Sequence, residues 1–375
     1  MVDLALKILL HDKLRFTITV AGVAFAVALV LSQVGLFFGL LNNATLTIRH
    51  ASADLWVTSH NTPNVDFAHQ FPETYVNRVR SVPGVARADN LIVTFMNIAL
   101  PNGAEEGGIF YALEDFGAWN LPWIVKEGDV QDLRRGEFIF LDESAKRRLG
   151  NFATGDFREV QHNRLRIAGL SQEAKSFTTT PVSFIDFRRA QEMNPDLLKG
   201  QTSYILVKLA PGANVAAVKS EIKQRLPFND VYTRDEWASK SEAYWIKNTG
   251  IGLNAFLAVF LGVLVGVVVV AQTLYTSTME HIKEFGTVKA IGGSNADIYR
   301  ILARQATIAA VLGFILGLGL AFAQKPAIEA MSLKLIMPAS TIAIVAVGTL
   351  LLCLASAMVS FRKVANMDPG LVFRS

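Results

Sequence analysis

The sequence is poor in cysteine and in charge. Its 375 residues include a single cysteine, and 18% of them are charged, against roughly 25% in an average soluble domain. One cysteine excludes a disulfide framework, and a hydrophobic content of 51% excludes a disordered or collagen-like chain. Because Cys353 falls inside an uncharged run near the C-terminus, the rest of the chain must fold without covalent cross-links.

Motifs for catalysis and nucleotide binding are also missing. The sequence has no G-x-x-x-x-G-K-[ST], G-x-G-x-x-G, H-E-x-x-H or G-x-S-x-G motif and no cysteine cluster. His60 and His69 are the closest histidine pair of the central segment, but no cysteine or carboxylate accompanies them at ligand spacing. We therefore expect no metal site, no cofactor bound by this chain, no catalytic residues and no unaided ATP hydrolysis.

Long uncharged runs are what the sequence has in excess. Four stretches without Asp, Glu, Lys or Arg, at 16–41, 248–279, 305–324 and 335–361, contain 26, 32, 20 and 27 residues. Each can span a bilayer, because a hydrocarbon core of about 30 Å needs roughly 20 apolar residues in a helix. The first run exceeds the roughly 7–15 apolar residues of a signal peptide, so we expect it to be a permanent anchor.

The basic residues indicate an orientation. Ten lysines and arginines lie in the segments 1–15, 280–304 and 362–375, whereas two lie in the short loop 325–334. This asymmetry predicts cytoplasmic N- and C-termini in a plasma (inner) membrane, with residues 42–247 outside the cytoplasm. The external segment holds 24 basic and 25 acidic residues, so the positive excess belongs to the membrane part. It indicates contact with anionic membrane lipids and no nucleic-acid partner.

Residues 42–247 predict a large α+β domain of two subdomains between the first and second spans. Alternating apolar residues and turn signals indicate two strand–helix–strand units, separated by a β-rich insertion at about 102–200. The last unit contains an amphipathic helix at 215–226 whose apolar stripe is Val215, Val218, Ile222 and Leu226. The expected elements are strands at 53–58, 90–100, 136–141, 165–170, 204–209 and 230–233 and helices at 72–81 and 215–226.

Glycines four residues apart occur in three spans. Small residues at this spacing allow close approach of helix backbones in lipid, so they predict a packed bundle and a dimer. The pairs are Gly35 with Gly39, Gly262 with Gly266, and Gly313 with Gly317. No span has an ionisable residue away from its ends, which argues against an ion-coupled transporter.

The segment 280–304 reads EHIKEFGTVKAIGGSNADIYRILAR. It predicts a short helix around 285–291, a break at Gly292 and Gly293, and Ser294 as the N-cap of the next helix. The short helix either receives a soluble partner or lies on the inner leaflet. Residues 1–15 predict an amphipathic helix in the membrane interface, with contact to a partner as an alternative.

The run EFGTVKAIGGSNADI, the terminal VANMDPGLVFR and the order of spans resemble the FtsX-like, MacB-type ABC transporter permeases over nearly the whole chain. Within this family, ASADLWV, EAYWIKNTGIG and LYTSTMEHIKEFGTVKAIG are most similar to the DevC-like permease of the heterocyst glycolipid exporter. Many members have Glu where this chain has Gln305, so no role of that carboxylate is transferred.

The resemblance implies a homodimeric, non-catalytic permease with a MacB-type periplasmic core domain and a separate cytoplasmic ATPase that binds ATP and Mg²⁺. The function it implies is mechanical export of an amphipathic envelope compound, such as a glycolipid, with a periplasmic adaptor and an outer-membrane channel. The alternatives are a regulator that activates a cell-wall hydrolase and a two-component haem or lipoprotein extractor. The residues matching the family's ATPase-coupling segment are Glu284, Phe285, Gly286, Val288, Lys289, Ala290, Ile291 and Gly292.

In that segment, Phe285, Val288 and Ile291 recur at the spacing of one helix face, and we expect them to be apolar anchors in a groove of the ATPase. Glu284 and Lys289 would then form ion pairs at the rim of the groove.

Overall fold

The computed structural model describes residues 13–178, 180–290, 292–331 and 333–365. The chain divides into a helical unit, built from the segments up to Gly39 and from Gly252 onward, and an external unit, Leu40–Ile251. The predicted helix at 1–15 lies almost entirely outside the described residues, as do Ile291 and most of the tail 362–375. Each unit is described by itself.

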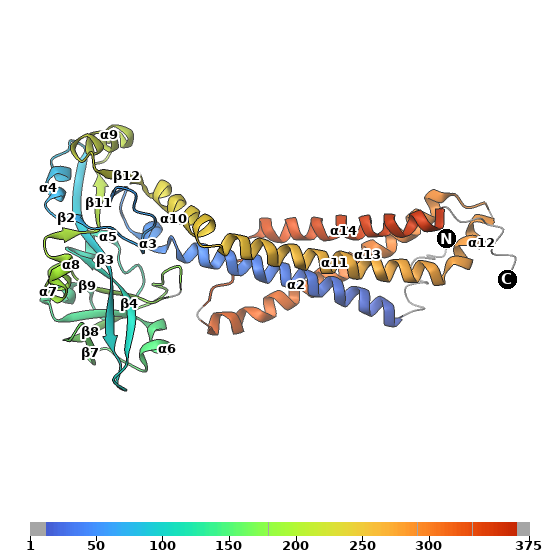
Figure 1. Ribbon diagram of the computed structural model, residues 1–375, viewed down its shortest axis with the longest axis horizontal. Coiled ribbons are helices and arrows are strands. Elements are labelled where there is room, and N and C mark those ends of the chain that lie inside the picture. Colours follow the sequence, from blue (N-terminus) through green and yellow to red (C-terminus); the bar gives the residue numbers. More distant parts are fainter. Residues whose placement is uncertain (1–12, 179, 291, 332, 366–375) are drawn as a thin grey trace. The chain divides into compact units, whose positions relative to one another are not determined.

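Four long helices form the helical unit (Figure 1). They are long and apolar enough to cross a membrane, as the uncharged runs predict. A fifth, short helix, α12 (Ile282–Ala290), connects the second long helix to the third. The long helices are α2 (Lys13–Asn43), α11 (Ile251–Glu280), α13 (Asn295–Ala330) and α14 (Ala339–Ala365).

Helix α13 extends beyond the predicted span at both ends, although its start agrees with the predicted N-cap at Ser294. It begins at Asn295, ten residues before the uncharged run, and continues to Ala330 through Pro326, where a loop at 325–334 was expected. The third helix thus carries basic residues in its first turns and extends beyond its apolar run. The connection from α13 to α14 is consequently limited to residues 331–338.

The external unit is built on one ten-stranded sheet. The order is β12-β1-β11-β3-β4-β9-β6-β8-β5, and β7 pairs with β3 and β8. Pairing is antiparallel except between β4 and β9 and between β6 and β8. The paired strands are β1 (Leu55–Ser59), β3 (Val85–Ala99), β4 (Glu105–Leu113), β5 (Val125–Glu127), β6 (Phe138–Asp142), β7 (Phe157–Val160), β8 (Asn163–Ser171), β9 (Val182–Asp186), β11 (Tyr204–Leu209) and β12 (Asn229–Thr233).

Short helices cover this sheet, and a two-residue pair, β2 (Phe71–Pro72) with β10 (Gln201–Thr202), lies apart from it. The α-helices are α3 (Leu46–His50), α4 (Tyr75–Arg80), α5 (Phe116–Trp119), α6 (Lys146–Leu149), α7 (Phe187–Met193), α8 (Pro195–Leu198), α9 (Val215–Arg225) and α10 (Arg234–Asn248). Two 3₁₀ turns, η1 (Val130–Arg135) and η2 (Glu143–Ala145), complete the unit.

Strand alternation divides the core between the two faces of the sheet. Side chains at i and i+2 share a face, so Leu91 and Val93 of β3 join one hydrophobic cluster and Ile92 joins another. The first cluster continues along the whole sheet beneath α3, α5 and α10, whereas the opposite face carries two separate clusters. One of these lies under α4 and α9 and the other under α6, α7 and α8, toward opposite ends of the sheet (Figure 1).

This arrangement confirms the α+β fold and qualifies the two subdomains. The two ends of the sheet have their own cores on one face, but β3 and the cluster on the other face join them. The amphipathic helix α9 buries Val218, Ile222 and the following Leu226, as predicted. Val215, in the first turn of α9, is 42% exposed. The prediction that it belongs to the buried apolar stripe was therefore wrong.

Candidate functional site

The candidate coupling segment lies at one end of the helical unit. Helix α12 follows α11 after one residue, His281, whose imidazole Nδ1 is 2.9 Å from a carboxylate oxygen of Glu284. Glu284 is exposed, while Phe285 and Gly286 are buried. The short helix therefore has one face toward the bundle and a second, bearing Glu284, toward solvent.

Phe285 corrects part of the sequence interpretation. Its ring is 1% exposed and belongs to the core of the helical unit, with side chains of α2, α11, α13 and α14. Val288 is partly buried against the same core. Phe285 is therefore not available to insert into a partner's groove, and it instead fixes α12 to the transmembrane bundle.

A sharp turn connects α12 to α13. Gly292 has φ +92°, a left-handed conformation that favours glycine, and the N–H of Gly293 donates to the carbonyl of Val288 at 2.8 Å. Ser294 then caps α13 as predicted: its hydroxyl accepts from the N–H of Asp297, whose carboxylate accepts from the N–H of Ser294. Both ends of the turn are thus held by hydrogen bonds.

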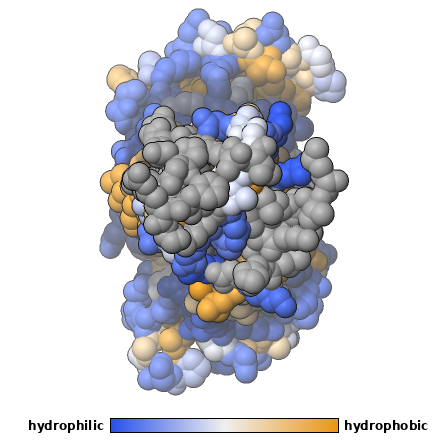
Figure 2. Space-filling model, turned by 90° about the vertical axis from the view of Figure 1, so that its right-hand side faces the viewer, coloured by the Kyte–Doolittle hydropathy of each residue, from blue (hydrophilic) through white to orange (hydrophobic). Residues whose placement is uncertain are grey.

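The same end of the unit carries paired charges. Arg15, near the start of α2, forms a two-bond ion pair with Glu280, the last residue of α11. Arg300 lies 3.0 Å from Asp297 on the first turns of α13. The nearer coloured side chains in Figure 2, which faces this end, are mostly hydrophilic. The start of α2 and the end of α11 are therefore connected electrostatically beside the coupling segment.

Two family comparisons identify this arrangement. Residues 16–225 match the MacB-like periplasmic core domain, and residues 256–369 match the FtsX-like permease C-terminal family. The chain belongs to the FtsX-like, MacB-type ABC transporter permeases. The two matched regions correspond to α2 with most of the external unit, and to α11 through α14.

Similar proteins cover the whole permease. An uncharacterised ABC transporter permease of Mycobacterium tuberculosis is 24% identical over 363 residues, which are 96% of this chain and 95% of that protein. A second one from the same species is 23% identical over 375 residues, 98% of each chain. Among solved structures, the periplasmic region of MacB from Actinobacillus actinomycetemcomitans has a TM-score of 0.41 and 12% identity, covering 50% of this chain and 92% of that one. The names of the two mycobacterial permeases specify no cargo.

The glycine pairs of the permease are in contact within one chain. A Cβ on Gly313 or Gly317 would lie 2.5 or 2.7 Å from side-chain carbons of Val23 or Val27 in α2. On α11, Gly262 faces Leu29 and Gly266 faces Ala26, while Gly35 and Gly39 face the segment 334–337. All six glycines thus bring backbones together around α2, and their role in a dimer stays a prediction.

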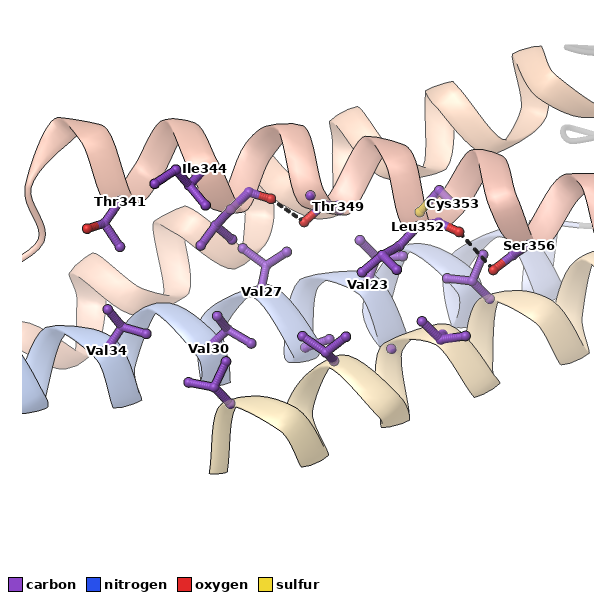
Figure 3. A pocket seen from close by; sticks show the side chains of 18 of the residues that line it. Val23, Val27, Val30, Val34, Thr341, Ile344, Thr349, Leu352, Cys353 and Ser356 are labelled. Carbon is purple, nitrogen blue, oxygen red and sulfur yellow. Dashed lines mark hydrogen bonds between the residues drawn. The ribbon is translucent and has the colours of Figure 1, made fainter. Parts of the chain in front are cut away.

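An apolar groove of about 420 Å³ runs between α2, α11 and α14 of the permease (Figure 3). Valines dominate its lining, including Val23, Val27 and Val30. The hydroxyls of Thr349 and Ser356 donate to carbonyl oxygens of their own helix, Val345 and Leu352, at 2.8 and 2.9 Å. These groups are therefore satisfied inside α14, and the groove resembles the lipid phase in its chemistry.

A second cavity, in the external unit, was not foreseen from the sequence. It has a volume of about 350 Å³ and is lined by Asp66 and Phe67, by Phe95 of β3 and by Leu197 of α8. Burial raises the pKa of Asp66 to about 7, although the N–H of Phe177 and the hydroxyl of Tyr111 stabilise its charged form. A perturbed carboxyl group in a cavity is a typical feature of a binding site.

The histidine pair considered above is separated by the fold. His60 lies 3.2 Å from both carboxylate oxygens of Asp230, which also accepts from Lys223, and His69 lines the second cavity. No cluster of three metal-ligating side chains occurs in the described part of the chain.

Proposed function

We propose that this chain is the membrane subunit of an ATP-driven exporter in which α12 transmits the movement of a separate ATPase. The observation that carries the proposal is the position of Phe285. Its ring is fixed in the core of four transmembrane helices, so a force applied to α12 reaches the whole bundle. The exposed Glu284 and the residues that match the family's coupling segment supply the surface for the ATPase.

The covalent path of such a movement is short. Helix α2 ends at Asn43 and α3 begins at Leu46, while α10 ends at Asn248 and α11 begins at Ile251. Within the external unit, α3 and α10 are connected by an ion pair between Arg49 and Glu242 at 3.1 Å. The hydroxyl of Ser241 also donates to the carbonyl of Ala44 at 3.2 Å. A shift of α2 against α11 would therefore act first on the contacts between α3 and α10.

The cargo we propose is an amphipathic envelope compound such as a glycolipid. This choice rests on the resemblance to the DevC-like permease, and it includes a periplasmic adaptor and an outer-membrane channel as partners of the external unit. ATP and Mg²⁺ would bind to the ATPase. The permease would act as a homodimer in the inner membrane with both termini in the cytoplasm, which the distribution of ten basic residues against two supports.

Site-specific photo-crosslinking tests the coupling assignment. A photoreactive amino acid replaces Glu284, on α12, or Glu329, near the opposite end of α13 and 47% exposed in its side chain. We expect position 284 to capture a protein with nucleotide-binding motifs and position 329 to capture none. Equal capture at the two positions, or none at 284, would refute the assignment.

A second experiment tests the export function. The full chain, tagged and cross-linked mildly in native membranes, should retain the ATPase together with a periplasmic adaptor, and its deletion should deplete one class of envelope lipid. Recovery of a peptidoglycan hydrolase in place of the adaptor, with unchanged envelope lipids, would replace export by regulation of the cell wall.

A further inference from the structure

The cavity of the external unit combines aromatic walls with a buried acid. Two phenylalanine side chains, Phe67 and Phe95, are 41% and 50% exposed beside it, and Leu197 is 48% exposed. At about 350 Å³ it falls within the range of small-molecule sites, which are concave, mostly apolar and equipped with few polar groups.

The aromatic walls are held in place from behind. The rings of Phe67 and Phe95 stack with centroids 6.4 Å apart. Phe67 also contacts Trp245 of α10 at 5.7 Å, and Trp245 stacks on Phe177 at 3.9 Å. Phe95 follows Val93 on the same face of β3, at the point where the cluster beneath α10 ends. Two large apolar rings therefore stay exposed in a fixed position, which is costly in water unless a ligand covers them.

Asp66 supplies a charge without a counterion. The residue is 5% exposed and lines the cavity next to Phe67. The hydroxyl of Tyr111 of β4 lies 3.5 Å from its carboxylate, and the hydroxyl of Tyr204 of β11 donates to the carbonyls of Asn64 and Val65 nearby, but neither tyrosine can neutralise the charge. Asp66 takes part in no ion pair of the described residues. A buried carboxylate in this condition is destabilising, and a cation in the cavity would relieve it.

We propose that this cavity binds an organic ammonium ion, with Asp66 as its counterion and the exposed side of the stacked Phe67–Phe95 pair as its cation–π partner. The negative face of an aromatic ring attracts a cation, and aromatic cages recognise quaternary ammonium groups in this way. An anion would meet Asp66, and a neutral apolar ligand would leave its charge uncompensated. The proposal does not depend on the exporter function, because it concerns the external unit alone.

The pH dependence of binding follows from the same carboxylate. Since burial holds the pKa of Asp66 near 7, the carboxylate is largely charged at pH 8 and largely protonated at pH 6. Affinity for a permanent cation should fall about tenfold between those values. His69 also lines the cavity, so a His69→Gln variant separates its contribution from that of Asp66.

The test uses the full chain in a neutral detergent with choline as the probe, titrated by saturation-transfer NMR. Its uncharged isostere, 3,3-dimethyl-1-butanol, measures the apolar contribution. We expect choline to bind at least about tenfold more tightly than the isostere, and Asp66→Asn to weaken choline by a similar factor. Phe95→Leu should weaken it roughly two- to thirtyfold. Asp196→Asn, which removes an exposed charge beside Leu197, should leave the affinity within twofold.

Three results would overturn the proposal: equal affinity for choline and its isostere, unchanged affinity in Asp66→Asn, or a pH slope that disappears in His69→Gln. Asp66→Asn should fold at least as well as the parent, so loss of binding in it cannot be assigned to misfolding. Glycerophosphocholine distinguishes two sources of the ammonium group. Competition as strong as that of choline would indicate a lipid headgroup, and weak competition would indicate a free organic cation.

Discussion

Replacing Asp66 by Asn should stabilise the external unit at neutral pH. The pKa of Asp66 is raised from 3.8 to about 7 because the carboxyl group is buried. The folded state therefore favours the protonated form, and the stability that this form provides is lost as pH rises from about 4 to about 7. Since one pKa unit corresponds to about 1.4 kcal/mol, charged Asp66 costs about 4 kcal/mol at pH 8 and about 1 kcal/mol at pH 4.5. Asn is isosteric and carries no charge, so it avoids this cost.

Intrinsic fluorescence measures this effect without isolating the domain. All five tryptophans of the chain lie in the external unit, so their emission reports on that unit in the full-length protein. For a domain of this size, 4 kcal/mol corresponds to a rise in Tm of roughly 8–16 °C at pH 8, shrinking to a few degrees at pH 4.5. The tryptophans are Trp56, Trp119, Trp123, Trp237 and Trp245.

Asp230→Asn is the matched control. Hydrogen bonds and charge from Lys223, with His60 and the N–H of Asn61, outweigh burial and lower the pKa of Asp230, so its charged form stabilises the fold. This variant should lower Tm at pH 8 and have less effect as pH falls toward 4. A lower Tm for Asp66→Asn at pH 8, or a Tm difference from the parent that does not change with pH, would refute the reasoning about Asp66.

Three further substitutions and one control test how the two units are packed. Phe285→Ala should destabilise the helical unit by about 3–5 kcal/mol, because it removes a buried ring from the core. It should also release α12 from the bundle, which hydrogen exchange would detect as faster amide exchange in α12. Unchanged exchange would contradict the anchoring role of Phe285. Gly313→Leu should lower the thermal stability of the bundle, whereas Gly348→Leu, whose position has open space around it, should not. The indole N–H of Trp119 donates to Asp89 inside the core of the external unit, while Arg80 and Arg87, which also pair with Asp89, have second carboxylate partners in Glu114 and Asp115. Asp89→Ala should therefore cost about 1–3 kcal/mol in urea unfolding followed by tryptophan fluorescence, because it leaves the buried indole N–H without an acceptor, and an unchanged unfolding midpoint would contradict this role.

Local patterns were sufficient for much of the fold. The strand at Tyr204–Leu209 has the predicted bounds, and the N-cap at Ser294 was predicted from a serine that directly follows the break at Gly292 and Gly293. Helix α13 illustrates a limit at its other end: its start after Ser294 was predicted, but charge defined the predicted end of the span, and the helix continues past Pro326 to Ala330. An apolar run locates the part of a helix that suits lipid, and it does not define where the helix ends.

Contacts between distant residues explain what the sequence did not reveal. Phe285 sits at a spacing that suits either an exposed anchor or a core residue, and only the packing of four other helices decides between them. The cavity of Asp66 is harder still to predict, because its lining combines residues far apart in the sequence, such as Phe95 of β3 and Leu197 of α8. A single buried acid in a loop has no periodicity, so no pattern in the sequence marks it.

The continuity of the sheet through β3 has a practical consequence. This strand of 15 residues pairs with β11 in one half of the external unit and with β4 in the other. Deleting the insertion at 102–200 would remove β4, β9 and β6 and leave the far half of β3 as a long, apolar, unpaired edge, which invites aggregation. Shortened versions for crystallisation or domain exchange should therefore keep Leu40–Ile251 whole, and the surface of this unit is better altered by substitutions in loops than by exchanging the insertion.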